Sequence, residues 1–455
     1  MKRAIILSLF VLMTISCCRT CDNRKNSILK PENAEFLVSD IMIPDSLLKY
    51  PRISDEDLLT LVQKKTFSYF WDYAHPVSGL ARERLGSGDT VTSGGSGFGI
   101  MAIPVAVERG FITRDAGASR LLQITTFLDE TAERFYGAYP HWLDGRTGKA
   151  IPFSAKDDGG DVVETALLFQ GLLTAARYFD SSDSLESAIR TKVDKLWNSV
   201  QWNQYMNGKD ELFWHWSPEF GWEMHLPVRG WNEALIAYVL AASSKTYPIP
   251  SSAYDYGWAR NGAMANGQTY YNVYLPLGPD YGGPLFFAHY SFLGLDPREL
   301  SDKYARYWEQ NVAHTMINYR YCVSNPKGWS GYGPQVWGLT ASDIPGGYAA
   351  SSPTEDSGTV APTAALSSMP YTPQESMNAL RYYYYVLGDR LFGEYGFYDA
   401  FNMTKDWFSQ SYLAIDQGPI IIMIENYRTN LLWELFMESA DIQDGLCKLG
   451  FSVEK

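Results

Sequence analysis

Apolar residues recur at helical spacing along most of the chain. From Asp55 to Tyr73 one face of the predicted helix is apolar, and Ser54 just before it is a residue type that favours the helix N-cap. The same period predicts further helices at residues 97–109, 113–135, 161–179, 184–200, 231–243, 301–319, 373–387 and 419–437, and a short one near 285–292. Alternating strand patterns are almost absent from the sequence.

The segments between these helices are long. They cover residues 74–96, 136–160, 201–230 and 326–372 and are rich in Gly, Pro, Trp and Tyr. Loops of this length inside a domain usually carry function. Residues 201–228 are compatible with a hairpin. Paired helices joined by such loops favour an all-α fold of the α/α toroid type, in which two layers of helices surround a cleft at one end. A two-lobed helical protein is the alternative.

The composition favours a carbohydrate ligand and disfavours nucleic acid. Of 455 residues, 46% are hydrophobic and 15% are aromatic, including 14 Trp and 31 Tyr. Trp and Tyr offer a flat apolar face with a polar edge, which suits a sugar ring, although packing in a core accounts for most of them. The net charge of −13 repels phosphate backbones. A neutral oligo- or polysaccharide is therefore the expected partner.

The N-terminus has the pattern of a bacterial lipoprotein leader. Met1–Arg3 is basic, residues 4–15 are apolar but too few for an ordinary membrane-spanning helix, and residues 14–18 (TISCC) resemble a lipobox. We expect lipidation at Cys17, with Cys18 as the alternative. The expected location is the bacterial cell envelope, as a periplasmic or outer-membrane lipoprotein. The expected parts of the chain are a signal peptide at 1–17, a tether at 18–50 and one catalytic domain at 51–455.

The sequence contains no recognisable pattern for a metal or a cofactor. The six His residues are scattered, and Cys322 and Cys447, the cysteines beyond the leader region, have no zinc spacing and are compatible with buried thiols or one disulfide. The glycine-rich residues 94–99 follow no clear strand, so they do not indicate a nucleotide-binding loop. We therefore expect neither a metal nor a cofactor.

The densest group of acidic residues lies in residues 156–169 (KDDGGDVVETALLF). Asp157, Asp158, Asp161 and Glu164 surround a glycine turn that leads into an apolar helix, whose N-terminus favours negative charge. Four acids this close cannot all ionise cheaply, so we expect a raised pKa among them. Asp161 with Glu164 also matches a capping box, which is a purely structural alternative. The group favours acid–base chemistry on a sugar, because glycoside hydrolysis usually needs two carboxyl groups, one of them protonated.

Three other carboxylates stand in aromatic surroundings. Glu233 follows a loop rich in Trp and His, and its alternative role is to compensate a helix dipole. Asp416 precedes an apolar helix that Glu425 interrupts, and an ion pair with Arg428 is the alternative role of Glu425. The acidic residues of 351–358 are expected in a solvated loop. The candidates for substrate binding are Trp142, Trp214, His215, Trp231, Trp337, Asp416 and Glu425.

Four segments in this order resemble the glycoamylase-like domain of glycoside hydrolase family 144, the endo-β-1,2-glucanases. They are residues 92–99 (TSGGSGFG), 157–164, 230–233 (GWNE) and 416–428. The resemblance spans about residues 54–438. It implies an (α/α)6 toroid, no metal in the chemistry, and cleavage of β-1,2-glucan to sophorooligosaccharides with inversion at the anomeric carbon.

The resemblance also implies the catalytic residues. It matches the general acid to Glu233 and the other catalytic residues to Asp157, Asp161 and Glu164. The identity of the general base stays open between Asp161 and Asp416. An inverting enzyme leaves room for a water between its two carboxyl groups, and either residue could act through such a water.

Three other functions remain open at this point. A non-catalytic glycan-binding lipoprotein would also be helical and aromatic, but it would not need clustered carboxylates. An exo-acting β-glucosidase on related oligosaccharides would use the same residue types. A polysaccharide lyase usually holds its uronate with Arg or Lys, which the negative net charge disfavours.

Overall fold

The computed structural model describes residues 40–453. The expected signal peptide and the lipidation candidates Cys17 and Cys18 lie outside the described residues. Within the described part of the chain, no helix combines the length and apolar character needed to cross a bilayer.

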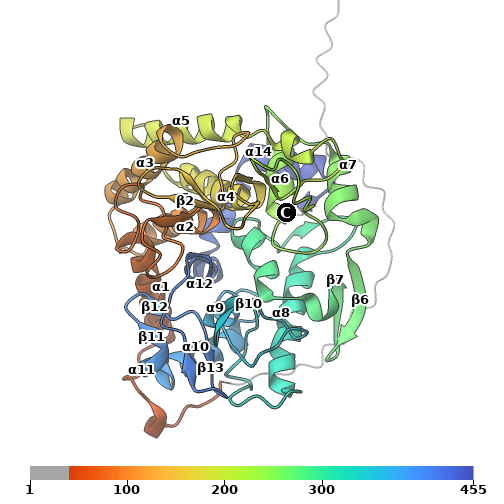
Figure 1. Cartoon of the computed structure of the whole chain (residues 1–455). Coiled ribbons are helices and arrows are strands. Elements are labelled where there is room, and N and C mark those ends of the chain that lie inside the picture. The colour runs from red at the N-terminus through yellow and green to blue at the C-terminus, as the bar shows by residue number, and fades with distance from the viewer. Residues whose placement is uncertain (1–39, 454–455) are drawn as a thin grey trace, which may run out of the picture. The chain divides into compact units, whose positions relative to one another are not determined.

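Helices make up most of the regular structure (Figure 1). The α-helices are α1 (Asp55–Trp71), α2 (Ser93–Glu108), α3 (Arg114–Glu130), α4 (Val162–Tyr178), α5 (Ser184–Ser199), α6 (Leu235–Ser243), α7 (Ser251–Ala253), α8 (Tyr307–Ser324), α9 (Pro362–Leu366), α10 (Pro373–Tyr385), α11 (Gly388–Leu391), α12 (Ala414–Thr429), α13 (Leu431–Met437) and α14 (Ala440–Lys448). Shorter 3-10 or π segments are η1 (Asp45–Leu47), η2 (Trp202–Met206), η3 (Tyr254–Trp258), η4 (Arg260–Gly262), η5 (Asp280–Gly282), η6 (Leu285–Ala288) and η7 (Tyr290–Leu293).

The strands are short and form small antiparallel sheets. They are β1 (Thr90–Thr92), β2 (Trp142–Asp144), β3 (Ala150–Ile151), β4 (Gly160–Asp161), β5 (His215–Trp216), β6 (Ala265–Tyr270), β7 (Val273–Leu277), β8 (Leu300–Ser301), β9 (Ala341–Ile344), β10 (Gly347–Ala350), β11 (Phe392–Gly393), β12 (Gly396–Phe397), β13 (Phe401–Asn402), β14 (Trp407–Phe408) and β15 (Ser452–Val453). Two pairings position the site: β4 with β5 sets Asp161 opposite His215, and β9 with β10 sets Asp343 opposite Tyr348.

The helices form two layers. In the inner layer α2 lies between α4 and α12, α4 also contacts α6, and η7 contacts both α6 and α12, so the layer closes on itself. Helix α9 lies beside α12. In the outer layer α1 packs on α2 and α12, α3 on α2, α5 on α4, α14 on α6, α8 on η6, and α10 on α9. This is the all-α toroid that the sequence predicts.

Glycines allow the inner helices to approach closely. A Cβ atom at Gly97 would overlap the carbonyl oxygen of Leu167, and one at Gly171 would overlap the carbonyl oxygen of Gly97. Gly418 meets Phe98 in the same way where α12 crosses α2. The backbones of α2 and α4 therefore touch where other residues would hold them apart. The glycine-rich segment noted in the sequence is a helix-packing segment.

The inner helices begin at the same end of the toroid. The backbone N–H of Gly94, at the start of α2, donates to the carboxylate of Glu164 in the first turn of α4 (2.7 Å). In the same way Thr363 of α9 donates to the backbone carbonyl of Asp416 in the first turn of α12 (2.9 Å). Helix N-termini carry partial positive charge, so this end of the fold stabilises carboxylates.

The predicted helices are present, with shifted ends. Ser54 caps α1 as expected, because its hydroxyl oxygen accepts from the backbone N–H of Asp57 (3.1 Å). Helix α2 begins at Ser93 rather than at residue 97. The glycines of its first turn belong to the helix because they pack against neighbouring segments. Helix α6 begins only at Leu235, so Glu233 precedes the helix rather than lying in its first turn.

Other differences concern breaks that apolar periodicity does not reveal. The helix predicted at 419–437 is two helices, α12 and α13, separated by Asn430 in a left-handed conformation (φ 63°). The helix predicted at 301–319 begins at Tyr307, because residues 300–301 form a strand. The hairpin expected in residues 201–228 is confirmed by bridges that join Phe213 to Pro227 and Ser217 to Gly221.

Residues 40–50, assigned above to the tether, pack against the helices. Ile43 is buried, and the backbone N–H of Lys49 donates to the carbonyl of Tyr385 on α10 (2.7 Å).

The close contact of α2 and α4 predicts a strong effect of one methyl group. Gly171→Ala should lower the free energy of unfolding by about 1–3 kcal/mol, because the new Cβ must push two backbones apart. Urea unfolding measures the change in midpoint. Gly333→Ala is the matched control, because its Cβ would meet no atom nearer than 3.9 Å. Equal stability of the two variants would contradict the tight helix contact.

Candidate active site

Asp161 both caps helix α4 and holds a histidine. Its Oδ1 accepts from the backbone N–H groups of Val163 and Glu164 (2.9 Å each), and its Oδ2 lies 3.2 Å from Nδ1 of His141. The cap predicted from the sequence is therefore confirmed. The second half of the capping box is not formed, because the carboxylate of Glu164 turns to Gly94 on the neighbouring helix.

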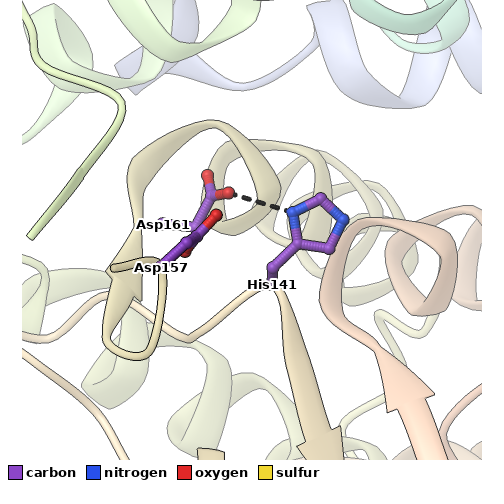
Figure 2. Close-up of side chains that lie close together, drawn as sticks. All are labelled: His141, Asp157 and Asp161. Atoms are coloured by element: carbon purple, nitrogen blue, oxygen red, sulfur yellow. Dashed lines mark hydrogen bonds and ion pairs between the residues drawn. The ribbon is translucent and has the colours of Figure 1, made fainter. Parts of the chain in front are cut away.

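His141 supplies the positive charge of this group. Figure 2 shows its ring facing Asp161, with Asp157 beside it. Its Nε2 also lies 3.9 Å from Oε1 of Glu164. Burial opposes protonation of the imidazole, but the negative charges of Glu164, Asp161 and Asp157 outweigh it and raise the pKa of His141 to about 9. The imidazole is therefore protonated at neutral pH and donates to Asp161.

Two carboxyls of the acidic turn have raised pKa values. Burial, followed by the charge of Asp161, raises the pKa of Asp157 to about 7. Burial also raises the pKa of Glu164, although His141 opposes it. The direction agrees with the expectation from four clustered acids, but burial is the first cause of both shifts and repulsion between the acids only adds to it.

Glu233 approaches this turn from a distant part of the sequence. It lies just before α6, where the hydroxyl of Ser291 donates to its backbone carbonyl. Burial raises the pKa of Glu233 to about 7, and the negative charges of Glu164 and Asp161 add to the effect. These charges act on Glu233 because the two segments converge on one end of the toroid. Glu233 thus holds a proton for a substantial fraction of the time at neutral pH.

A second acidic group lies at the start of α12. Arg84 donates from Nη1 to Asp343 (3.0 Å), and the backbone N–H of Asp343 donates to Oδ2 of Asp399 (2.6 Å). The carboxyls of Asp399 and Asp416 interact closely, and the negative charge of Asp399 adds to burial in raising the pKa of Asp416, so Asp416 holds the proton of the pair. Burial is the main cause that raises the pKa of Asp399 to about 7 and that of Asp416 well above its usual range.

Tyr290 on η7 lies between the two acidic groups. Burial, and then the negative charges of Asp416, Glu233 and Glu164, raise the pKa of its phenol. Tyr348 on β10 stands over the second group and is 47% exposed. The two acidic groups therefore belong to one site.

Three side chains of the site could in principle hold a cation. His141, Asp157 and Asp161 offer ligand atoms that lie within 4.8 Å of one another (Figure 2). However, Asp161 already accepts two backbone hydrogen bonds and one from His141, and a protonated imidazole cannot bind a metal. The ion pair accounts for the group, and we assign no metal to it.

Four of the predicted binding residues lie at this end of the fold: Asp416, described above, and three residues near the acidic turn. Trp142 on β2 is partly exposed and meets the ring of His141 edge-on, with centroids 5.7 Å apart. Trp214 accepts the backbone N–H of Val162 (2.8 Å), which places it beside the start of α4. His215 is buried opposite Asp161 in the β4–β5 pair, and burial lowers its pKa.

Two predicted stacking residues are core residues instead. Trp231 is buried between Phe292 and Tyr307, with ring centroids 6.0 and 6.2 Å away. Trp337 is fully buried, and its indole N–H donates to the carbonyl of Glu375 (3.4 Å). Neither side chain has a face open to a sugar, because each fills the interior between helices. The assignment of Trp231 and Trp337 to substrate binding is therefore wrong.

Glu425 is also wrongly placed in the substrate-binding set. It lies near the end of α12 opposite to Asp416 and accepts both Nε and Nη2 of Arg109 (2.8 and 2.7 Å) and an amide N–H of Gln63 (2.9 Å). Its alternative partner, Arg428, pairs instead with Glu56. Glu425 lies near the C-terminal end of α12, away from the end of the toroid that carries the site. Its role is therefore a structural ion pair with Arg109.

Several site residues had not been singled out in the sequence. They are His141, Arg84, Asp343, Asp399, Tyr290 and Tyr348. Only His141 carried a local signal, because it directly precedes Trp142 and lies in the long loop 136–160 that leads into the acidic turn. An all-α toroid with converging, partly protonated carboxyls at the N-terminal end of its inner helices has the architecture of a glycoside hydrolase.

Comparisons with known proteins agree with this class. The family model described as "Putative glucoamylase" matches residues 225–440. An endo-β-1,2-glucanase from Chitinophaga pinensis, solved with sophorotriose and glucose, is 51% identical with a TM-score of 0.86, over 88% of this chain and 99% of that one. A Bacteroides uniformis protein of the same description as the family model is 56% identical with a TM-score of 0.88, over 89% of this chain and 99% of that one.

A curated relative is longer. The exo β-1,2-glucooligosaccharide sophorohydrolase of Parabacteroides distasonis is 49% identical over 427 residues, which are 89% of this chain. The matched part spans 59% of the length of that relative.

The chain belongs to the glycoamylase-like family of glycoside hydrolases, family 144.

The protonated His141 makes stability depend on pH. Its folded pKa of about 9 lies above the ordinary value of 6.5, so its stabilising effect is complete below pH 6.5 and is lost as pH rises to 9. The difference in unfolding free energy between wild type and His141→Gln should therefore shrink by up to about 3 kcal/mol over that interval. Chemical unfolding at several pH values measures it.

His215→Gln is the matched control for this measurement. Burial lowers the pKa of His215, so its imidazole is neutral throughout and its difference from wild type should stay constant between pH 7 and 9. A constant difference for His141→Gln as well would contradict the ion pair.

Proposed function

We propose that the chain hydrolyses β-1,2-glucan at internal linkages and releases sophorooligosaccharides, with inversion at the anomeric carbon. The observation that carries the proposal is the Glu233 carboxyl, whose pKa is raised to about 7 beside a group of further carboxyls. A carboxyl of this kind is protonated for a substantial fraction of the time at neutral pH and can give its proton to a leaving oxygen.

Glu233 acts as the general acid in this proposal. Its proton is retained by burial and by the nearby charges of Glu164 and Asp161. When the glycosidic bond breaks, the departing hydroxyl takes this proton, and the resulting carboxylate lies at the N-terminal end of the inner helices, where negative charge is stabilised.

The general base is assigned to the Asp399–Asp416 pair, in which Asp399 has the lower pKa and is the member that is ionised and can accept a proton. Asp161, the other candidate, accepts two backbone N–H groups and the imidazolium of His141, so three of its acceptor positions are already occupied. Asp399 and Asp416 together hold one proton and can accept another from an attacking water. Asp161 is then a positioning residue, which orients α4 and His141.

The internal mode of cleavage is supported by the relatives. The C. pinensis endo-acting protein matches along 99% of its length, whereas the exo-acting P. distasonis relative has a further part that this chain does not match. Exo action and binding without catalysis are the alternatives that the assays below separate.

Glu233→Gln should lower kcat about 10²–10⁴-fold, because the amide cannot donate the catalytic proton. Affinity for a β-1,2-linked oligosaccharide, measured by calorimetry, should remain. In the wild type, kcat/KM should fall as pH rises through about 7, where Glu233 loses its proton. Glu219→Gln, in an exposed position on the preceding loop, is the control and should be fully active. Unchanged turnover in Glu233→Gln would remove this residue from the mechanism.

Products of early turnover test the mode of cleavage. With β-1,2-glucan as substrate, viscosity should fall before many reducing ends appear, and chromatography should find mixed sophorooligosaccharides. Proton NMR of the first product should detect the α-anomer, because inversion of a β-linkage gives that form. Sophorose as the sole early product would support exo action instead. If no new reducing ends form at all, the protein binds glycan without hydrolysing it.

We also propose that the protein is anchored in the cell envelope through Cys17. The support is the leader pattern of the sequence alone. Cys17→Ala should remove the acyl mass of the mature protein in mass spectrometry, whereas Cys18→Ala should keep it. The reverse result would assign the lipid to Cys18.

A further inference from the structure

Phe153 is half-exposed next to the acidic turn. One face of its ring lies on the imidazole of His141, with centroids 4.1 Å apart and planes 23° apart, and Trp142 meets it at 67° with centroids 4.9 Å apart. The residue is nevertheless 49% exposed. Because one face is covered and Trp142 approaches at an angle, the exposed area belongs mainly to the other face.

A tight turn ties this ring to a carboxyl of the site. The backbone N–H of Phe153 donates to the carbonyl of Asp157 (2.8 Å), and the N–H of Asp157 donates to the carbonyl of Ser154 (3.1 Å). Lys156, at the outside of the turn, forms an ion pair with Glu223 on the neighbouring loop. The exposed face of Phe153 is therefore held at a fixed place relative to Asp157.

We infer that Phe153, with Trp142 at its edge, forms the stacking wall of a glucosyl-binding subsite directly beside Asp157 and Glu164. The ligand is a neutral pyranose unit of the glucan chain, whose C–H face lies on the free phenyl face. This inference rests on the proposed function and adds to it the place where one sugar unit is held.

The chemistry of the two ring faces supports this assignment. A phenyl face carries partial negative charge, which attracts the protonated His141 on one side and the weakly positive C–H groups of a sugar on the other. The hydroxyls at the rim of that sugar can then reach the carboxyl groups of the turn. The site thus offers an apolar face with hydrogen-bond acceptors beside it, as a pyranose requires.

Replacement by an apolar residue without a ring tests the wall. Phe153→Leu should raise KM for β-1,2-glucan about three- to tenfold, and kcat should change less than twofold, in line with the loss of one aromatic contact. Phe153→Tyr keeps the flat face and should restore KM. Tyr274→Leu removes a ring that is 60% exposed on β7 and should leave KM unchanged.

Phe153 could also act by covering the imidazole of His141 and keeping water from it. Two further measurements separate sugar binding from this role. Affinity for a β-1,2-linked oligosaccharide should fall by the same factor when Phe153→Leu is combined with the inactive Glu233→Gln. The pKa of His141, followed by NMR, reports any loss of shielding. A lower kcat with a shifted His141 pKa and unchanged affinity would overturn the subsite, as would a KM in Phe153→Leu equal to that of wild type.

Failure of the subsite and failure of the proposed function have different signatures. If the wild type hydrolyses β-1,2-glucan and Phe153→Leu does so with the same KM and the same affinity, only the subsite is wrong. If the wild type neither binds nor hydrolyses β-1,2-glucan, the proposed substrate is wrong and the subsite assignment falls with it.

Discussion

The contact between helices α2 and α4 is the constraint on which the site depends. Gly97 and Gly171 remove the side chains that would separate the two backbones. As a result the N–H of Gly94 reaches the carboxylate of Glu164, which is buried and would otherwise lack its backbone donor. Fixing α4 in this way also fixes its cap, Asp161, and through Asp161 the orientation of His141.

Each acidic group contains more carboxyls than cations. His141 faces Asp157, Asp161 and Glu164, and Arg84 faces Glu83 and Asp343, with Asp399 and Asp416 behind them. The cations cannot neutralise all of these charges, so the excess is removed by protonation. This is why burial can raise carboxyl pKa values here without a loss of the fold. The same imbalance that would destabilise an ordinary core gives this site carboxyls that hold protons near neutral pH.

Local signals in the sequence predicted the scaffold well and the site in part. Helical periodicity and caps such as Ser54 and Asp161 depend on neighbouring residues, so they can be read from one sequence. The second acidic group depends on segments that meet only after folding, and Asp343 and Asp399 carry no local mark of their partners. Trp231 and Trp337 were misassigned for the same reason, because residue type alone does not separate a buried indole from a sugar platform.

Binding and protonation are linked through the turn that carries Phe153 and Asp157. On the proposed function, a sugar unit on the free face of Phe153 excludes water from Asp157 and Glu164. Removal of water strengthens the pairing of these carboxyls with His141 and makes an additional negative charge more costly. Glu233, which already feels the charge of Glu164, is then held more firmly in its protonated form. The Asp399–Asp416 pair is buried before any substrate arrives, so its state depends less on binding. Substrate binding would therefore keep the general acid protonated without removing the ability of the general base to accept a proton, as an inverting hydrolysis requires.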